Sequence, residues 1–151
     1  MEYESFACIS FGQDREDTMK LSDYCSIGRN GTAWIDIDSG WKFHCTLYGI
    51  IPEYAQIFIR RLSKKRRLYD ENELLDAEVM IPDMDTQKFI VNAIKTVEKL
   101  FIATEDVSSA YSEIQQMTCD SYYDTMRRYY SNLLGELNDH RFMLIDQLMR
   151  I

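Results

Sequence analysis

Apolar residues follow two different periods along this chain. In residues 1–51, short runs rich in β-branched and aromatic residues are separated by glycines, and five of the six glycines lie there. Residues 86–151 contain one glycine and no proline, and apolar residues recur there three and four positions apart. This order predicts an α+β fold: an N-terminal antiparallel β-sheet within about 4–51, with a further strand near 77–82, packed against C-terminal helices within about 86–151.

Three segments of the N-terminal part are predicted to be extended. Residues 4–11 are apolar on both alternating faces, which is typical of a central strand. Residues 20–28 are a second candidate and are followed by the turn sequence Arg-Asn-Gly. Residues 32–50 predict a hairpin that turns at 38–40, where Gly40 can supply the left-handed conformation.

The two faces of this hairpin predict its register. A two-residue loop would pair Ile35 with His44 and would mix apolar and polar side chains on each face. A three-residue loop over 38–40 makes one face wholly apolar, and register follows the buried face. We therefore expect these cross-strand pairs: Ile37 with Trp41, Asp36 with Lys42, Ile35 with Phe43, Trp34 with His44 and Ala33 with Cys45.

Helices are predicted for most of the remaining chain. One begins at Pro52, because proline is tolerated in a first helical turn. Asp85 or Thr86 is expected to cap a second helix over 86–103, which carries a stripe of apolar residues. The last helical segment is predicted over 107–151, with interruptions near 118–121 and near 138–139.

Length, composition and charge narrow the class of protein. A chain of 151 residues, of which 46% are apolar, suits a single domain, 1–151, with a sizeable core. The net charge is −8, and outside residues 60–67 there are 11 cations against 25 acids, a balance of −14. Such a surface repels phosphates, so we expect no stable binding of duplex DNA. A protein with a basic surface is the more natural partner.

The spacing of cysteine and histidine predicts neither a metal site nor a cofactor. Two histidines cannot complete an ordinary zinc set with cysteines this far apart, so reduced, buried thiols are expected. No apolar run approaches the ~18 residues of a membrane span. We therefore expect a cytoplasmic protein without a membrane segment. The cysteines are Cys8, Cys25, Cys45 and Cys119.

Residues 59–79 combine a run of six cations with a run of five acids. On a helical wheel, Arg61 and Lys65 lie within the apolar arc, which also contains Tyr69. Two unpaired buried charges would be costly, so they either extend past the helix edge or pair with acids of the sheet. The functional alternative is an anion pocket, in which both cations point at a phosphate or at the carboxylate of a partner. The other four cations point away from the arc: Arg60, Lys64, Arg66 and Arg67.

The sequence His44-x-Thr46 resembles one half of the paired H-x-T motif of 2H phosphoesterases. In that family, two such strands place two imidazoles on either side of a phosphodiester, and the threonines bind its oxygens. Strand alternation places His44, Thr46 and Tyr48 on one sheet face, with Lys42 beside them. The chain has no second H-x-T, since the other histidine, His140, lies in a helical context. One imidazole cannot be both acid and base in a single in-line step, so we expect a half-exposed structural histidine.

The C-terminal helices carry paired tyrosines. Two successive residues of a helix point in different directions, so one can pack inward while the other stays exposed. Exposed tyrosine is a preferred interface residue. We therefore predict a homo-oligomer, most simply a two-fold homodimer, formed through residues 111–151. The paired residues are Tyr122, Tyr123, Tyr129 and Tyr130.

These features favour a non-enzymatic protein-binding module with no catalytic residues. Its size and charge fit the profile of bacterial immunity proteins and phage-encoded inhibitors, which bind and block a macromolecule. The alternative is a small anion- or nucleotide-binding protein that uses Arg61, Lys65 and the His44 face. A degenerate phosphodiesterase of the 2H type is the third hypothesis. The common nucleotide-binding and hydrolase motifs are missing from the sequence.

Overall fold

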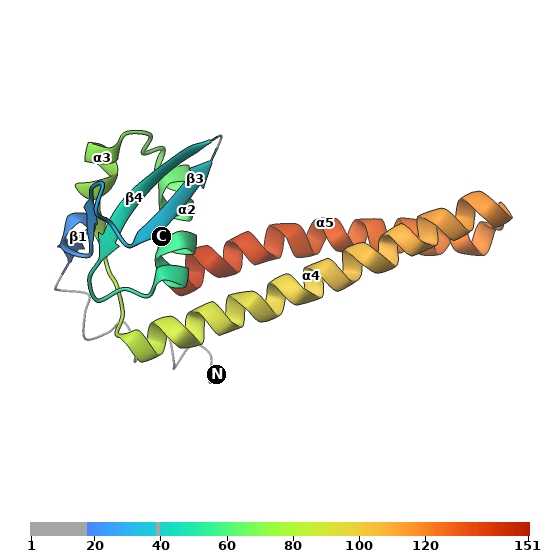
Figure 1. Cartoon of the computed structure of the whole chain (residues 1–151). Helices are drawn as coiled ribbons and strands as arrows, with labels where there is room; N and C mark the ends of the chain where they lie inside the picture. Colours follow the sequence, from blue (N-terminus) through green and yellow to red (C-terminus); the bar gives the residue numbers. More distant parts are fainter. Residues whose placement is uncertain (1–17, 39) are drawn as a thin grey trace. The chain divides into compact units, whose positions relative to one another are not determined.

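The computed structural model describes residues 18–38 and 40–151, and it shows the predicted α+β fold. The chain divides into two compact units. The first contains the described residues up to Val91 together with Asp146–Ile151, and the second contains Asn92–Ile145. The first unit holds both sheets and the shorter helices, and the second is a helical hairpin (Figure 1). The strand predicted over 4–11 lies outside the described residues.

Two small antiparallel sheets lie in the first unit. Strand β1 (Met19–Lys20) pairs with β5 (Glu78–Val79), which confirms the further strand predicted near 77–82. The second sheet has the strand order β2–β4–β3. Its strands are β2 (Cys25–Ile27), β3 (Ala33–Asp38) and β4 (Trp41–Leu47).

The single strand predicted over 20–28 is wrong, because a 3-10 turn, η1 (Leu21–Asp23), divides it. The side chain of Asp23 accepts a hydrogen bond from the backbone N–H of Lys20 at 3.0 Å, and Leu21 is completely buried. This local hydrogen bond competes with strand pairing and closes the turn. As a result, β1 and β2 belong to different sheets.

The β3–β4 hairpin has the predicted register over most of its length. The pairs Ala33 with Cys45, Trp34 with His44, Ile35 with Phe43 and Asp36 with Lys42 are all present. Ile35 and Phe43 are buried, so the apolar face is the core side, as the register argument requires. The predicted pair of Ile37 with Trp41 is wrong. A β-bulge follows Asp36, and Asp38 lies opposite Trp41, so the loop is shorter than three residues.

Helix α2 (Pro52–Arg66) begins at the predicted proline and packs on β3. Tyr54 and Phe58 are buried on the side that meets the sheet. Each fully buried large apolar side chain contributes roughly 1.5–3 kcal/mol, so this helical face is a main source of stability. The helix ends where Arg67 takes a left-handed φ of 56°, and the predicted extension of its apolar arc to Tyr69 is wrong.

Two long helices follow the short helix α3 (Glu71–Leu75): α4 (Met84–Thr118) and α5 (Ser121–Met149). The interruption predicted near 118–121 is confirmed, and Cys119 takes a left-handed φ of 53° there. The interruption predicted near 138–139 is wrong, since α5 passes through these residues. Helix α4 likewise runs through 103–107 without a break.

The N-terminal cap of α4 is Asp83, and neither Asp85 nor Thr86 has this role as predicted. The Asp83 side chain accepts a hydrogen bond from the backbone N–H of Thr86 at 2.7 Å. This bond lowers the pKa of Asp83 below its ordinary value, because the backbone donor stabilises the carboxylate. One turn later, Gln87 is completely buried, and its amide bonds to the backbone of Gly49, Ile51 and Pro82.

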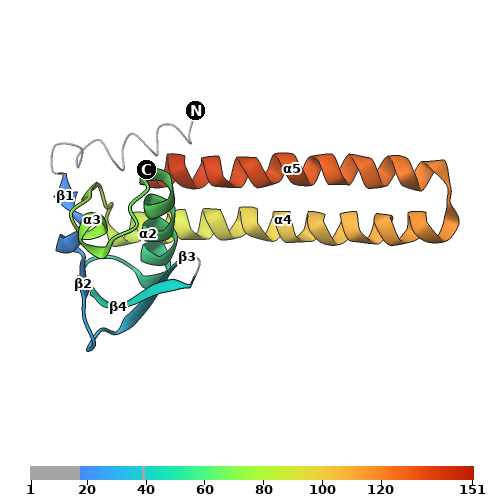
Figure 2. The ribbon, with the colours of Figure 1, turned by 90° about the horizontal axis from the view of Figure 1, so that it is seen from above.

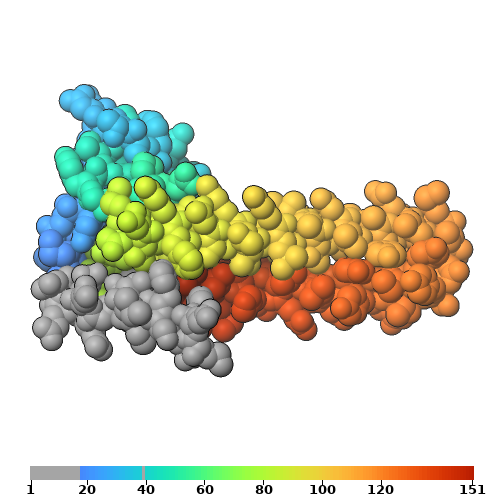
Figure 3. Space-filling model, turned by 90° about the horizontal axis from the view of Figure 1, so that it is seen from below, coloured from blue at the N-terminus to red at the C-terminus, as the bar shows by residue number. Residues whose placement is uncertain are grey.

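In the second unit, α4 and α5 lie side by side as an antiparallel pair (Figures 2 and 3). Arg141 joins them through an ion pair with Glu98 at 2.8 Å, and its guanidinium lies 4.1 Å from the centre of the Phe101 ring. Further along the pair, Tyr111 stacks on Tyr130 with ring centres 5.4 Å apart. These interhelical contacts explain why α5 is continuous at 138–139, because packing outweighs the low helix propensity of Asn and Asp.

Candidate functional site

The outward face of the second sheet carries an aromatic and cationic cluster. The indole of Trp34 stacks on the imidazole of His44, with ring centres 4.4 Å apart and planes 6° from parallel. The ammonium group of Lys42 lies 5.3 Å from the centre of the Trp34 ring, within the range of a cation–π contact. The register creates this cluster, because Trp34 and His44 are direct cross-strand neighbours.

The other residues predicted for this face lie along β4 and beyond its end. Thr46 lies opposite Ser26 of β2, and Tyr48 is an exposed side chain after the last residue of β4. A shallow hollow of about 390 Å³ opens beside the cluster. Its polar and charged lining comes from Arg29, Lys42, His44 and Glu71.

A single imidazole lies on this face in the described part of the first unit. The other histidine, His140, belongs to α5 in the second unit. The in-line step of 2H phosphoesterases needs one imidazole as general acid and a second as general base. His44 is only one of these two imidazoles. Within residues 18–38 and 40–151, no group of three His, Cys, Asp or Glu side chains could hold a metal ion.

Arg61 and Lys65 both contact Asp146, near the end of α5. Arg61 donates from Nε to Oδ1 at 2.7 Å and from Nη2 to Oδ2 at 3.0 Å, while Lys65 Nζ donates to Oδ2 at 3.2 Å. Burial alone would raise the pKa of Asp146, but the hydrogen bonds from Arg61 and Lys65 outweigh it and lower the pKa. The two cations therefore pair with an internal acid, which comes from a helix and not from the sheet.

These cations and the His44 face do not form one site. Helix α2 covers the inner side of the second sheet, where Ile35 and Phe43 are buried, whereas His44 lies on the outer side. Arg61 and Lys65 point from α2 towards Asp146. The anion site predicted from these residues together is thus divided between two sides of the first unit.

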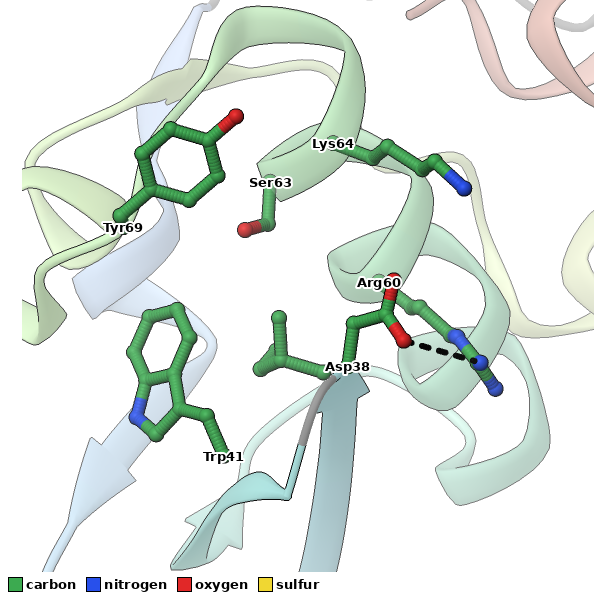
Figure 4. A pocket seen from close by; sticks show the side chains of 7 residues that line it. Asp38, Trp41, Arg60, Ser63, Lys64 and Tyr69 are labelled. Atoms are coloured by element: carbon green, nitrogen blue, oxygen red, sulfur yellow. Dashed lines mark ion pairs between the residues drawn. The ribbon is translucent and has the colours of Figure 1, made fainter.

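A second hollow of about 390 Å³ lies between α2 and the β3–β4 hairpin (Figure 4). Trp41 and Tyr69 line one side of it, and Arg60 and Lys64, one helical turn apart, line the other. Arg60 and Lys64 are exposed, as their positions outside the apolar arc predict, whereas the prediction that Tyr69 belongs to this arc is wrong. The sequence does not indicate this hollow, because Tyr69 lies beyond the end of α2 and only the fold brings Trp41 opposite the two cations.

The paired tyrosines divide between the inside and the outside of the helical hairpin. Tyr123 and Tyr130 are half-buried and lie 6.4 and 5.4 Å from Tyr111, measured between ring centres. Tyr122 and Tyr129 are exposed and meet their neighbours edge to face. One member of each pair packs inward as expected, and the two outward members are seven residues apart on α5.

An exposed apolar stripe runs along α4. We call it the α4 stripe: Leu100, Ala103, Val107, Ala110, Ile114 and Met117. The alternating spacing of three and four residues keeps all six on one face of the helix, in the pattern of a coiled-coil seam. All six are exposed, so this seam is not used inside the hairpin.

The α4 stripe and the outward tyrosines lie on the same side of the hairpin. Leu100 directly precedes the inward-facing Phe101, and Tyr122 directly precedes the inward-facing Tyr123. The α4 stripe is therefore rotated by roughly 100° about its helix axis from the residues of α4 that face α5. The outward tyrosines are rotated by the same amount, and in the same sense along their own helix, from the residues of α5 that face α4. When two antiparallel helices face each other, equal rotations bring the two stripes to the same side of the pair.

The exposed row on this common face is mostly apolar, and charged residues border it. On α5, the row on this face has a spacing of seven residues and consists of Tyr122, Tyr129, Glu136 and Met143. Glu136 is the acid of this row. Contiguous exposed apolar surface of this kind marks interaction sites in proteins. None of the charged residues of α4 in this unit belongs to the stripe, but three of them border it, each directly before a stripe residue: Lys99, Asp106 and Glu113.

Comparisons of the chain with protein-family models, with curated proteins and with solved structures find no significant match. Within the described residues, none of the helices combines the length and the apolar character that a membrane crossing requires. Function is therefore inferred from the surfaces and hollows of the two units themselves.

Proposed function

We propose that this chain is a non-enzymatic protein-binding module that works as a two-fold homodimer, joined through the face of its helical hairpin that carries the α4 stripe. The α4 stripe carries the proposal, because it is an exposed apolar seam of coiled-coil spacing on the same side as Tyr122 and Tyr129. Monomeric proteins rarely leave such a seam open to water. A second copy of the chain supplies an identical apolar stripe, so the six stripe residues can be covered without a charged residue directly opposite them.

The size of this face suits a dimer. Between Tyr122 and Met143, α5 rises by about 32 Å at ~1.5 Å per residue. Two helices about 9 Å apart, with their side chains, present a width of about 20 Å. The flat projection of the face is therefore about 600 Å², which falls within the ~600–1,000 Å² that each partner buries in specific interfaces.

The α4 stripe is also complementary to itself. When two copies of α4 cross antiparallel about a two-fold axis midway between positions 107 and 110, Val107 faces Ala110 of the second copy. The next layer on each side pairs Ala103 with Ile114, so a larger side chain meets a smaller one in each of these layers. Such alternation lets facing helices interdigitate, and the two-fold axis produces every contact twice.

The charge of the dimer indicates what else it would bind. Two copies with a net charge of −8 each form an acidic assembly, which attracts a protein with a basic surface and repels nucleic acid. A role as an inhibitor or immunity-type protein that blocks such a partner fits the size and charge of the chain.

Leu100 and Ile102 provide a matched pair for the test. Each is 54% exposed, and they are two residues apart on α4, but only Leu100 belongs to the stripe. We expect Leu100→Glu to convert the dimer to a single chain, because a carboxylate in the interface would be desolvated without a partner. Ile102→Glu should keep the wild-type mass. Light scattering across about 1–100 μM, a range that spans common dimer affinities, measures both.

A wild-type mass of one chain over this range would contradict the proposed dimer. Equal effects of the two substitutions would contradict the assignment of the interface to the stripe. Circular dichroism of both variants verifies that each is folded, since both substitutions are at exposed helical positions.

A further inference from the structure

The hollow between α2 and the β3–β4 hairpin has two chemically different sides. Figure 4 shows Trp41 and Tyr69 along one side, and Arg60 and Lys64 along the other, with the charged ends of these two cations directed away from the rings. Tyr69 is 69% exposed, so its ring is open to a ligand. The volume of about 390 Å³ lies within the ~300–1,000 Å³ of small-ligand sites.

The fold leaves an excess of positive charge in this hollow. Arg60 has Asp38 at 3.9 Å, at the outer limit of an ion pair, and among the described residues Lys64 has no acid within ion-pair distance. The neighbouring cations of α2, Arg61 and Lys65, instead share Asp146. Two cations and one acid thus line a concave surface in a chain whose net charge is −8.

We infer that this hollow binds a small ligand that combines a flat aromatic ring with one anionic group, a phosphate or a carboxylate, as in a nucleoside monophosphate. The ring stacks against the aromatic side formed by Trp41 and Tyr69. The anionic group extends towards α2, where the exposed side chains of Lys64 and Arg60 turn to it and form charge-assisted hydrogen bonds. The site lies in the first unit and is independent of the proposed dimer face in the second.

The two tryptophans of the chain allow a direct measurement. In Trp34→Phe, the remaining tryptophan is Trp41, so its fluorescence reports on this hollow alone. We expect adenosine monophosphate to quench that fluorescence saturably. Adenosine and inorganic phosphate each lack half of the required chemistry and should bind at least about tenfold more weakly. Nicotinate tests whether a carboxylate serves as the anionic group, and its binding in place of the nucleotide would also support the inference.

Lys64→Gln and Lys42→Gln are matched variants, because both lysines are exposed and each lines a different hollow. We expect Lys64→Gln to weaken binding about tenfold and Lys42→Gln to leave it unchanged. Calorimetry with the unsubstituted chain gives the same ranking of ligands without relying on a variant. Failure of both millimolar nucleotide and millimolar nicotinate to quench saturably would overturn the inference, as would unchanged affinity in Lys64→Gln.

Discussion

The guanidinium of Arg61 and the carboxylate of Asp146 form a two-point ion pair, although the residues are 85 positions apart in the chain. The side chains are 22% and 14% exposed, so the pair is largely shielded from water. Lys65 adds a third hydrogen bond to this carboxylate and also donates to the backbone carbonyl of Ile151 at 3.3 Å. The pair ties α2 to the end of α5 within the first unit.

Removing the guanidinium should therefore destabilise the first unit. We expect Arg61→Met to lower the free energy of unfolding by on the order of 1–3 kcal/mol, because it leaves a partly buried carboxylate with one remaining partner. Arg60→Met is the matched control on the same helix. Arg60 is exposed, so its replacement should change stability by less than ~0.5 kcal/mol. Urea melts of the two variants compare them, and equal losses would argue against this role of the pair.

The same carboxylate predicts a dependence of stability on pH. The pKa of Asp146 is lower in the folded chain than its unfolded value of ~3.9, so its contribution is fully present above about pH 4. The stability that the Asp146 carboxylate contributes begins to fall below about pH 4, and it is lost as the pH passes through the lower pKa of the folded state. We expect Asp146→Asn to be clearly less stable than wild type at pH 7, and the difference to shrink towards pH 3. Melts at both pH values measure it, and a constant difference would contradict the expectation.

The hydroxyl of Tyr54 is buried and has no hydrogen-bond partner among the described residues. Tyr54→Phe keeps the ring, which stacks on Phe58 with centres 5.8 Å apart, and removes the unsatisfied group. We expect this change to raise the free energy of unfolding by about 0.5–2 kcal/mol. Tyr54→Ala should lower it by ~3–5 kcal/mol through the cavity it creates. A loss of stability in Tyr54→Phe would show that the hydroxyl has a partner in solution.

The thiols should differ in reactivity. Burial, with the neighbouring Cys45, raises the pKa of Cys25 to about 12, and burial also raises the pKa of Cys45. The expectation of a buried thiol is wrong for Cys119, which is exposed in the turn that joins α4 and α5. In a Cys8→Ser variant we expect the thiol of Cys119 to react quickly with maleimide. The thiols of Cys25 and Cys45 should react only on unfolding. Mass spectrometry counts the adducts, and fast labelling at more than one site would contradict the described burial.

Duplex DNA should not bind measurably at physiological salt. The six cations of residues 60–67 lie within a chain of net charge −8, so any contact with phosphate is local and strongly dependent on salt. A gel shift with a random-sequence duplex tests this, and a complex that survives ~200 mM salt would refute it.

Local sequence patterns were enough to predict the elements whose geometry depends on near neighbours. The pairing of Ile35 with Phe43 follows from strand alternation and a buried face, and the start of α2 follows from the chemistry of Pro52. The turn at Cys119 could also be predicted, because it separates two long helical patterns. The β-bulge after Asp36 could not, since both registers near the loop keep the same residues on the apolar face.

Some features of the candidate sites could be predicted from the sequence, and others follow only from the tertiary structure. The sequence alone showed that Tyr122 and Tyr129 would each have an inward-facing neighbour, because a helix turns roughly 100° per residue. It also showed that Arg61 and Lys65 needed negative partners, because buried charge must be neutralised. It could not identify Asp146 as that partner, or bring Trp41 opposite Lys64. Such contacts join residues far apart in the chain, and they depend on where whole helices and strands come to rest.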